Sequence, residues 1–542
     1  MNRLGKKSAA LMLTATMVAG LAACGKTDQP AAAGNSTPVT QESAKDTESG
    51  KENTQPDNQG IDLSEHVKIV YMTTGDPKNA DVVDSVLGEL NAILTEKANA
   101  ELEIYYIPWT DYLSNYNLTL AQMDGTVDLI GTASDWLDAW PNSQNGAFLP
   151  LSEEMLSTYA PKTWAQVPAE NWDMCKWNGD IYLMPEDHFT QWTNHGFMYR
   201  NDFAEEAGLS DGAHSWEDMT TYFKSVKANH PDMIPWDSDG TQTIEMPVGW
   251  MVSRTDFVPA EGILAGRIIG GSKDDLYKLW SPFYEGDELA EFARLMKEWD
   301  EIGVWKTDVL NNQGVNATDE LSVGQTAAVQ HHTNTWFTEA GPKTKTQQGV
   351  DTGFFWFGEE RGNVVSLNIT HGAMAVSAAS KHPERALMVY DLLRNDEECY
   401  RLINYGQENV QYEITEDGFK QDPEGYDRDK QEFISNWWWG RNDDLELRNI
   451  SYDWDSYDKI CAEYDKVKIP YPYGQFVPDL TKIQSQLNNI TEIHTNYMKQ
   501  ITYGKYKGTP EDIVAEYREA LKNAGFEEVL AQLQSQMDAL YK

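Results

Sequence analysis

The 542-residue chain is poor in cysteine and in positive charge. It contains four cysteines, and its 43 Lys and Arg residues face 86 Asp and Glu residues, for a formal net charge of −43. Without a C-x-x-C pair, so few cysteines predict no disulfide framework, and we expect unpaired thiols at Cys175, Cys399 and Cys461, with one disulfide among them as the alternative. So acidic a chain repels phosphate backbones, which argues against nucleic acid as a partner.

Motifs of phosphate, serine-hydrolase and zinc-protease sites are absent as well. The sequence has no Walker-type loop, no G-x-S-x-G and no H-E-x-x-H. Residues 237–240 hint at a calcium loop, but Pro235 and Met246 occupy its first and twelfth ligand positions, so we interpret this segment as a turn. His331 and His332 are adjacent, yet nothing in the sequence supplies the rest of a metal shell. We therefore expect no metal and no cofactor.

The one long apolar run lies at the N-terminus, in the pattern of an export signal. Three basic residues precede the run 9–21, which is shorter than the ~20 residues that span a bilayer. Residues 21–24, Leu-Ala-Ala-Cys, resemble the bacterial lipoprotein signal, which implies removal of a signal peptide 1–23 and lipid on Cys24. An ordinary secretory signal with a chance cysteine is the alternative. Residues 24–60 are polar and predict a disordered tether behind the anchor.

Strands and helices alternate after this tether, which predicts an α/β fold with a mostly parallel sheet covered on both faces. Ligands of such sheets bind beyond the carboxyl ends of the strands. The predicted strands are residues 67–72, 102–107 and 127–130, and the predicted helices between them are residues 83–94 and 112–123.

Tryptophan and aspartate lie close together after two of these strands. Trp109 and Asp111 follow the second strand, and Asp135 and Trp136 follow the third. Aromatic rings offer flat apolar faces to sugar rings, and carboxylates accept hydrogen bonds from sugar hydroxyls. The pattern therefore favours a sugar site, although a single tryptophan at a strand end is more often packed in the core.

A turn at Asn178 and Gly179 opens the segment that connects this region to the rest of the chain. An apolar strand 181–184 then stops at Pro185, and a strand 197–199 leads into a helix whose C′ residue is Gly208. This order resembles the lobe crossover of extracellular solute-binding proteins, in the carbohydrate-binding family that includes maltose-binding protein. Further resemblance lies in residues 320–330, 366–373 and 509–536, so it extends from about Val67 to Lys542.

The resemblance implies a two-lobed, periplasmic-binding-protein-like (type II) fold with hinge crossovers and a ligand cleft between the lobes. It assigns residues 61–187 and 368–465 to lobe 1, and residues 188–367 and 466–542 to lobe 2. Ligand-driven closure is then expected in the crossovers at residues 185–191 and 368–372.

The resemblance also adds candidate binding residues. Trp336 matches an aromatic that stacks on sugar in the family, and Trp192 lies in the crossover. Three consecutive tryptophans, residues 437–439, cannot all point one way, so at least one belongs in the core and another is free to line the cleft. The candidate ligand-binding residues are Trp109, Asp111, Asp135, Trp136, Trp192, Asn334, Trp336 and Asn368.

We therefore predict a monomeric, lipid-anchored solute-binding protein on the extracellular face of the cell membrane. It captures an oligosaccharide and delivers it to the permease subunits of an ABC transporter, without catalysis. The alternatives from other classes are a secreted, surface-bound glycoside hydrolase or lyase and a surface adhesin with no small ligand. No motif specifies which sugar is bound.

Overall fold

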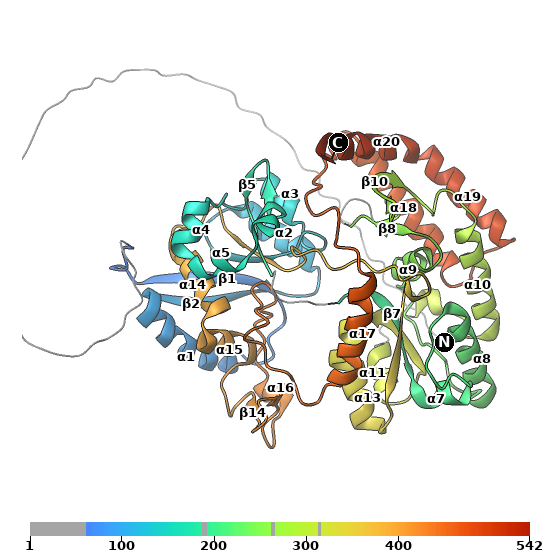
Figure 1. The fold of residues 1–542 in the computed structure, drawn as a ribbon, viewed down its shortest axis with the longest axis horizontal. Coiled ribbons are helices and arrows are strands. Elements are labelled where there is room, and N and C mark those ends of the chain that lie inside the picture. The colour runs from blue at the N-terminus through green and yellow to red at the C-terminus, as the bar shows by residue number, and fades with distance from the viewer. Residues whose placement is uncertain (1–60, 187–191, 262–265, 313–315, 542) are drawn as a thin grey trace, which may run out of the picture. The chain divides into compact units, whose positions relative to one another are not determined.

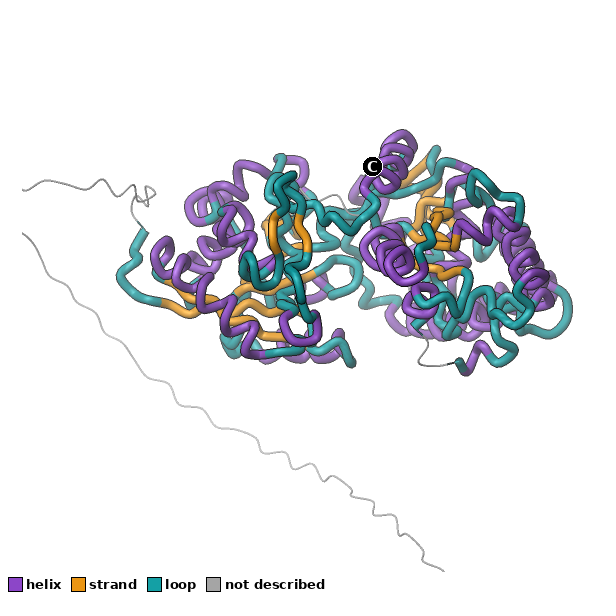
Figure 2. The backbone as a smooth tube through the Cα atoms, turned by 90° about the horizontal axis from the view of Figure 1, so that it is seen from below, coloured by secondary structure: helices purple, strands orange, loops and turns teal. Residues whose placement is uncertain are grey.

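The computed structural model describes residues 61–186, 192–261, 266–312 and 316–541. The predicted signal peptide, Cys24 and the tether up to residue 60 lie outside the described residues, so these assignments stay predictions. Most of the predicted crossover 185–191 lies outside them as well. The described residues belong to one unit of the chain, in which two groups of strands each have their own helices (Figures 1 and 2).

The first group is a five-stranded sheet in the order β2-β1-β3-β13-β6. β1 pairs in parallel with β2 and β3, as the alternating pattern predicted, whereas β13 runs antiparallel to β3 and β6. Pro185 ends β6 at the sheet edge, where a missing N–H breaks no ladder. The strands are β1 (Val67–Thr74), β2 (Ala100–Ile107), β3 (Leu129–Thr132), β6 (Met184–Pro185) and β13 (Ala373–Val376).

The helices of this sheet come from two distant parts of the chain, and Figure 1 shows α14 and α15 beside α1. The α1 helix begins where the Asn79 side chain accepts a hydrogen bond from the Asp81 N–H, and it ends at Asn99 in the left-handed conformation. These helices are α1 (Ala80–Ala98), α2 (Tyr112–Gln122), α3 (Ala139–Gln144), α4 (Glu153–Tyr159), α5 (Pro161–Gln166), α6 (Ala169–Asp173), α14 (Pro383–Asn395) and α15 (Glu397–Tyr405).

The second group contains two three-stranded antiparallel sheets. In the first, β7 (His195–Arg200) lies between β11 (Ala328–His332) and β12 (Thr352–Trp356). The second consists of β8 (Phe257–Pro259), β9 (Gly270–Ser272) and β10 (Asp275–Trp280).

The helices of the second group pack around two apolar cores, and in one of them the Phe197 ring packs edge-on against the rings of Trp216 and Trp236. They are α7 (Asn201–Glu206), α8 (Trp216–Asn229), α9 (Glu245–Arg254), α10 (Glu288–Ile302), α11 (Ala317–Ser322), α12 (Thr333–Thr335), α13 (Gly341–Gln348), α17 (Trp454–Val467), α18 (Gln484–Ile501), α19 (Pro510–Asn523) and α20 (Phe526–Tyr541), with short helices η1 (Val309–Asn311), η2 (Trp336–Ala340) and η3 (Glu359–Arg361).

Small elements connect the larger ones. The predicted turn at Asn178 and Gly179 has positive φ at both residues and closes a hairpin between β4 (Lys176–Trp177) and β5 (Asp180–Ile181). The strand predicted over residues 181–184 is therefore divided, because β5 pairs with the hairpin while β6 joins the sheet edge. The remaining elements are β14 (Glu413–Ile414), β15 (Lys420–Gln421) and α16 (Arg428–Gln431).

Helix α17 packs against the second group of strands. The Tyr464 ring lies 4.7 Å from the Trp192 ring and 5.1 Å from the Trp356 ring, centroid to centroid. The proposed lobe boundary at residue 465 would assign most of this helix to lobe 1, so a boundary before α17 fits its packing better. The lobe boundaries themselves remain predictions.

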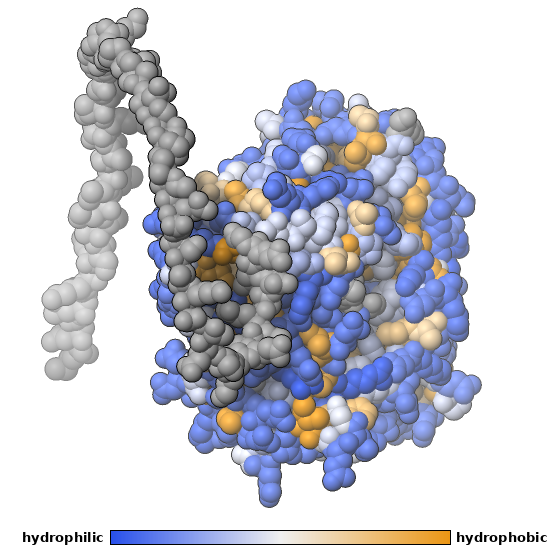
Figure 3. Space-filling view, turned by 60° about the vertical axis from the view of Figure 1, so that its left-hand side comes forward, coloured by the Kyte–Doolittle hydropathy of each residue, from blue (hydrophilic) through white to orange (hydrophobic). Residues whose placement is uncertain are grey.

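Outside the cores, the surface shown in Figure 3 is mainly hydrophilic, with small separate apolar patches. Across the described ranges, no helix combines the length and the apolar character needed to span a bilayer. Cys399 and Cys461 are free thiols, as predicted.

Candidate ligand-binding cleft

A cleft of about 1900 Å³ is lined by residues of both strand groups. The first group contributes the loops after β2 and β3, and the second contributes β7, β11 and the start of α9. Pockets for a single small ligand occupy about 300–1,000 Å³. This cleft therefore has room for a ligand of several rings.

The loops after β2 and β3 bring aromatic rings together at the cleft wall. The rings of Trp109 and Trp136 are stacked with centroids 6.2 Å apart, and Trp438 lies 6.0 Å from Trp109. Tyr112 lies edge-on to Trp109 at 5.6 Å. We refer to Trp109, Tyr112, Trp136 and Trp438 as the aromatic platform. Trp109 is 40% exposed, which is unusual for so large an apolar side chain and leaves part of it available to a ligand.

The position of the platform depends on a glycine in β3. A Cβ at Gly131 would lie 2.3 Å from Nε1 of Trp439, so only glycine lets this ring pack against the strand. The Trp439 ring is itself stacked against Trp136 with centroids 5.7 Å apart, and its Nε1 donates a hydrogen bond to Oγ1 of Thr73. Trp439 thus supports the platform from behind. Trp437 is buried in the core, in agreement with the expectation for this run of tryptophans.

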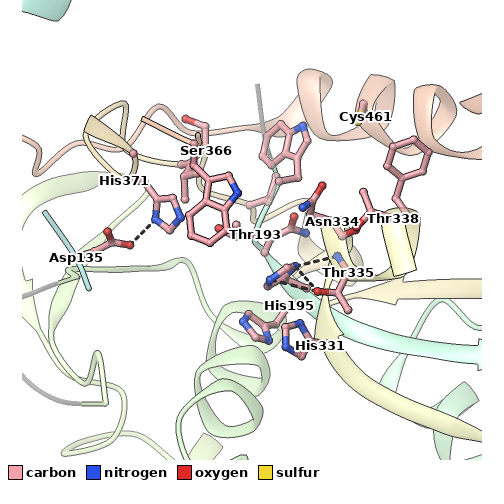
Figure 4. Close-up of a pocket in the computed structure, with 18 of the residues that line it drawn as sticks. Asp135, Thr193, His195, His331, Asn334, Thr335, Thr338, Ser366, His371 and Cys461 are labelled. Carbon is pink, nitrogen blue, oxygen red and sulfur yellow. Dashed lines mark hydrogen bonds and ion pairs between the residues drawn. The ribbon is translucent and has the colours of Figure 1, made fainter. Parts of the chain in front are cut away.

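A polar cluster lies where the chain returns from the second strand group. Nδ1 of His371 lies 2.7 Å from Oδ2 of Asp135, as Figure 4 shows. Next to this pair, Oγ of Ser134 accepts hydrogen bonds from Nδ2 of Asn368 and Oγ1 of Thr370. The return segment is therefore bound to the loop after β3.

Charges in this polar cluster influence one another. Burial alone would lower the pKa of His371, but the nearby Asp135 carboxylate outweighs it and raises the pKa to about 9. Burial raises the pKa of Glu186 to about 8, with His371 opposing the shift. At neutral pH the cluster accordingly presents a protonated imidazole and a largely neutral Glu186 carboxyl group.

The second strand group contributes three histidines and an ion-pair network. The ring centroids of His195, His331 and His332 lie 4.3–5.7 Å apart. Burial lowers the pKa of His195 to about 4, although the Glu245 carboxylate opposes this shift. Arg267 forms ion pairs with Glu245 and, at 3.3 Å, with Glu261. Figure 4 shows His195, His331 and Asn334 among the labelled residues of the pocket.

The side chains of the cleft described above do not form a metal site. The described part of the chain contains no group of three or more His, Cys, Asp or Glu side chains placed to hold an ion. The cleft instead offers flat aromatic faces beside hydrogen-bonding groups, which is the combination that binds a polyhydroxylated ligand.

Comparison with known proteins identifies the family. The sequence profile of bacterial extracellular solute-binding proteins matches residues 83–398, which is more than half of the chain. The chain belongs to this family. It is therefore a binding protein and not an enzyme, and the glycoside hydrolase or lyase alternative is set aside. A domain of unknown function (DUF3502) matches residues 472–542.

Individual relatives of this solute-binding protein agree with the family assignment. A protein of Streptococcus pneumoniae named carbohydrate ABC transporter substrate-binding protein is 23% identical over 490 residues, covering 85% of this chain and 89% of its own length. The crystal structure of NgtS, an N-glycan transport solute-binding protein from the same species, is 19% identical with a TM-score of 0.68, over 88% of this chain and 99% of that one. Alginate-binding protein AlgQ2 is 14% identical with a TM-score of 0.62, over 88% and 98%. These likenesses confirm the predicted two-lobed α/β fold of type II.

Five of the eight predicted binding residues line the cleft of this solute-binding protein: Trp109, Asp135, Trp136, Trp192 and Asn334. Trp109 and Trp136 belong to the aromatic platform. Trp192 is buried, and its main-chain oxygen accepts a hydrogen bond from the Asn334 N–H.

The other three predicted residues are not among those that line the cleft. Trp336 is stacked on Phe354 with centroids 5.5 Å apart and donates its Nε1 hydrogen bond to Thr352. Asn368 is 5% exposed, and its Nδ2 donates a hydrogen bond to Oγ of Ser134. Asp111 is exposed and precedes α2 with a φ of 54°.

Several lining residues were not predicted from the sequence. The sequence indicated that one of the tryptophans 437–439 could line the cleft, but it did not identify Trp438 as that residue. His371 lies inside the segment 366–373 that carried the family resemblance, but no signal paired it with Asp135. Other residues missed in this way are Glu186, His195, Glu245, Glu261 and Arg267.

Proposed function

We propose that this solute-binding protein is a monomeric, lipid-anchored receptor that captures an oligosaccharide outside the cell and delivers it to the permease of an ABC transporter. The observation that carries the proposal is the exposed face of Trp109 within the aromatic platform. An exposed indole costs free energy in water, and the C–H face of a sugar ring would cover it.

Polar groups next to the platform suit the hydroxyl groups of the same ligand. The Asp135 carboxylate accepts hydrogen bonds, while the protonated His371 donates them, and Asn334 does both. The volume of about 1900 Å³ supports a ligand of several sugar units rather than one. We propose Trp109, Asp135, Trp136 and Asn334 as ligand contacts, and Asn368 as a residue that orients Ser134 beside them.

The relatives support the sugar class. The pneumococcal relative is named for carbohydrate, and NgtS has been crystallised with Man1GlcNAc. N-glycan fragments are therefore the first ligands to test. The Leu-Ala-Ala-Cys sequence at residues 21–24 supports the lipid anchor, which would keep the receptor close to the permease.

Thermal unfolding of the purified protein with a panel of glycans tests the proposal. The panel contains Man1GlcNAc, Man5GlcNAc and linear neutral oligosaccharides. A ligand that binds only the folded state stabilises it by about 2.7 kcal/mol at a concentration of 100 Kd, which raises Tm clearly. Calorimetry then confirms binding, and chromatography should recover the glycan unchanged. No shift in Tm and no heat of binding across the panel would contradict a sugar-binding function.

A further inference from the structure

Although the cleft contains the protonated imidazole of His371, which is paired with the Asp135 carboxylate, its lining is rich in acidic residues. Ten of its lining residues are Asp or Glu, and five are Lys or Arg. The ten acidic residues are Asp135, Asp138, Glu186, Glu245, Glu261, Glu339, Asp443, Glu446, Asp458 and Asp465, and the five basic ones are Arg267, Lys420, Arg441, Arg448 and Lys468.

Four of the five cations already have a carboxylate of the protein as their partner. Arg267 pairs with Glu245 and Glu261, as described above. The other three pairs are Arg441 with Glu446 at 2.7 Å, Arg448 with Asp458 at 3.0 Å and Lys468 with Asp465 at 2.7 Å. To form an ion pair with one of these side chains, an acidic ligand would have to displace the carboxylate already bound to it.

Lys420 is the remaining cation, and its surroundings also oppose an acidic ligand. Its ammonium group lies 4.4 Å from the centre of the Tyr405 ring. The Tyr405 hydroxyl donates to Glu446 at 2.6 Å, so the same acidic side chain that pairs with Arg441 also faces this corner of the cleft. Burial lowers the pKa of Lys420, which further weakens it as a partner for an anion.

Carboxyl groups from both strand groups lie near one another in the cleft. Asp135 comes from the loop after β3, Glu186 follows β6, and Glu261 follows β8. Burial raises the pKa of Glu261, and the negative charge of Asp135 adds to that shift, so the two groups repel each other across the cleft. A carboxylate on a ligand would add to this repulsion, because the protein walls of a cleft focus the electric field of the charges that line it.

We propose that the cleft selects uncharged glycans and rejects glycans that carry uronic acid, sialic acid or sulfate. This inference rests on the proposed sugar-binding function and names the substrate class of the same cleft. The fold alone does not determine whether neutral or acidic glycans bind, because both NgtS and the alginate-binding protein share it. Neutral glycans are distinguished from acidic ones by repulsion between an acidic ligand and the carboxyl groups of the cleft, in addition to contacts with the preferred ligand.

Calorimetry with matched pairs of glycans tests the inference on the whole protein. One pair is β-1,4-mannotetraose and β-1,4-tetramannuronate, which share their linkage and differ in charge. The second pair is a biantennary N-glycan with and without terminal sialic acid. We expect the neutral member of any bound pair to bind at least about tenfold more tightly, since like charges at an interface cost several kcal/mol. Salt should narrow the difference, because it screens charge repulsion.

A variant isolates the electrostatic cause. Glu261→Gln removes an acidic group that acts on Asp135 and frees Arg267 from one of its two carboxylate partners, so we expect it to reduce the tenfold difference to less than about threefold. Glu527→Gln is the control, because Glu527 lies on α20 outside the cleft lining and should leave the difference unchanged.

Each outcome has a clear meaning. Binding of an acidic member as tightly as its neutral partner, at low salt, would overturn the inference and leave the proposed function intact. If no member of any pair binds, and no glycan of the wider panel binds either, the proposed function is overturned, and the inference with it.

Discussion

Nδ1 of His371 lies 2.7 Å from the carboxylate of Asp135, which joins the returning chain segment to the loop after β3. The aromatic platform adjoins this pair, since Nε1 of Trp136 donates a hydrogen bond to the main-chain oxygen of His371. One short segment therefore connects three features: the first sheet, the ligand cleft and the path between the lobes.

This ion pair predicts a loss of stability at alkaline pH. The pKa of His371, about 9 in the folded protein, lies above the usual value of 6.5. The stabilisation is therefore fully present below pH 6.5 and is lost as the pH rises through about 9. The shift corresponds to about 3 kcal/mol at most, and we expect about 1–2 kcal/mol because the His371 side chain is 20% exposed to water.

Asp135→Asn tests this prediction by urea unfolding at pH 6, 8 and 10. The variant should be less stable than the wild type at pH 6, and the difference should vanish near pH 10. Asp138→Asn is the matched control, because Asp138 also lines the cleft but accepts its hydrogen bond from Asn117 rather than from a histidine. A difference between wild type and Asp135→Asn that is constant across the pH range would contradict the role of the ion pair.

Two tryptophans predicted from the sequence should behave in opposite ways. Trp109→Ala removes an exposed ring of the platform, and we expect it to cost about 1–3 kcal/mol of glycan affinity with little change in Tm. Trp336→Ala removes a buried ring stacked on Phe354, so it should lower the free energy of unfolding by about 3–5 kcal/mol. Its folded fraction should bind glycan with unchanged affinity, as measured by calorimetry. The reverse pattern would mean that the platform is not the sugar site.

The difference between these tryptophans shows which parts of the fold and of the site could be predicted from the sequence. The strands and helices of the first sheet follow from hydrophobic periodicity, and the loops after β2 and β3 follow from topology, so Trp109 and Trp136 could be found. Trp336 was placed by family resemblance, which carries no information on which way a side chain points. The ion pair of His371 with Asp135 joins residues far apart in the sequence, and no local pattern predicts such a contact.

The predicted lipid anchor has a direct test. Cys24→Ser removes the thiol to which lipid would be attached, so the variant should move from the membrane fraction to the medium or the soluble fraction. Mass spectrometry of the wild type should find an N-terminal cysteine at position 24 with more than one acyl chain, since a single chain anchors only weakly. A variant that stays on the membrane, together with a wild type that carries no lipid, would contradict the anchor.

Ligand should also close the two lobes around the crossovers. A ligand that contacts residues of both strand groups gains all its contacts only when the lobes are closed, so its differential affinity favours the closed state. At the return crossover, a Cβ on Gly372 would lie 2.4 Å from Oε2 of Glu186 and 3.1 Å from the main-chain oxygen of Trp438. Gly372→Ala should therefore force a shift between the crossover and the platform.

Small-angle scattering measures the closure. The radius of gyration of the wild type should fall when a cognate neutral glycan is added at saturation, and the fall should be smaller in Gly372→Ala. Gly88→Ala is the control, because a Cβ at that position in α1 meets no atom within 4 Å and should leave both closure and affinity unchanged. The permease could then distinguish loaded from empty receptors by their shape. An unchanged radius in the wild type, with binding confirmed by calorimetry, would mean that the cleft is already closed or that one lobe holds the ligand alone.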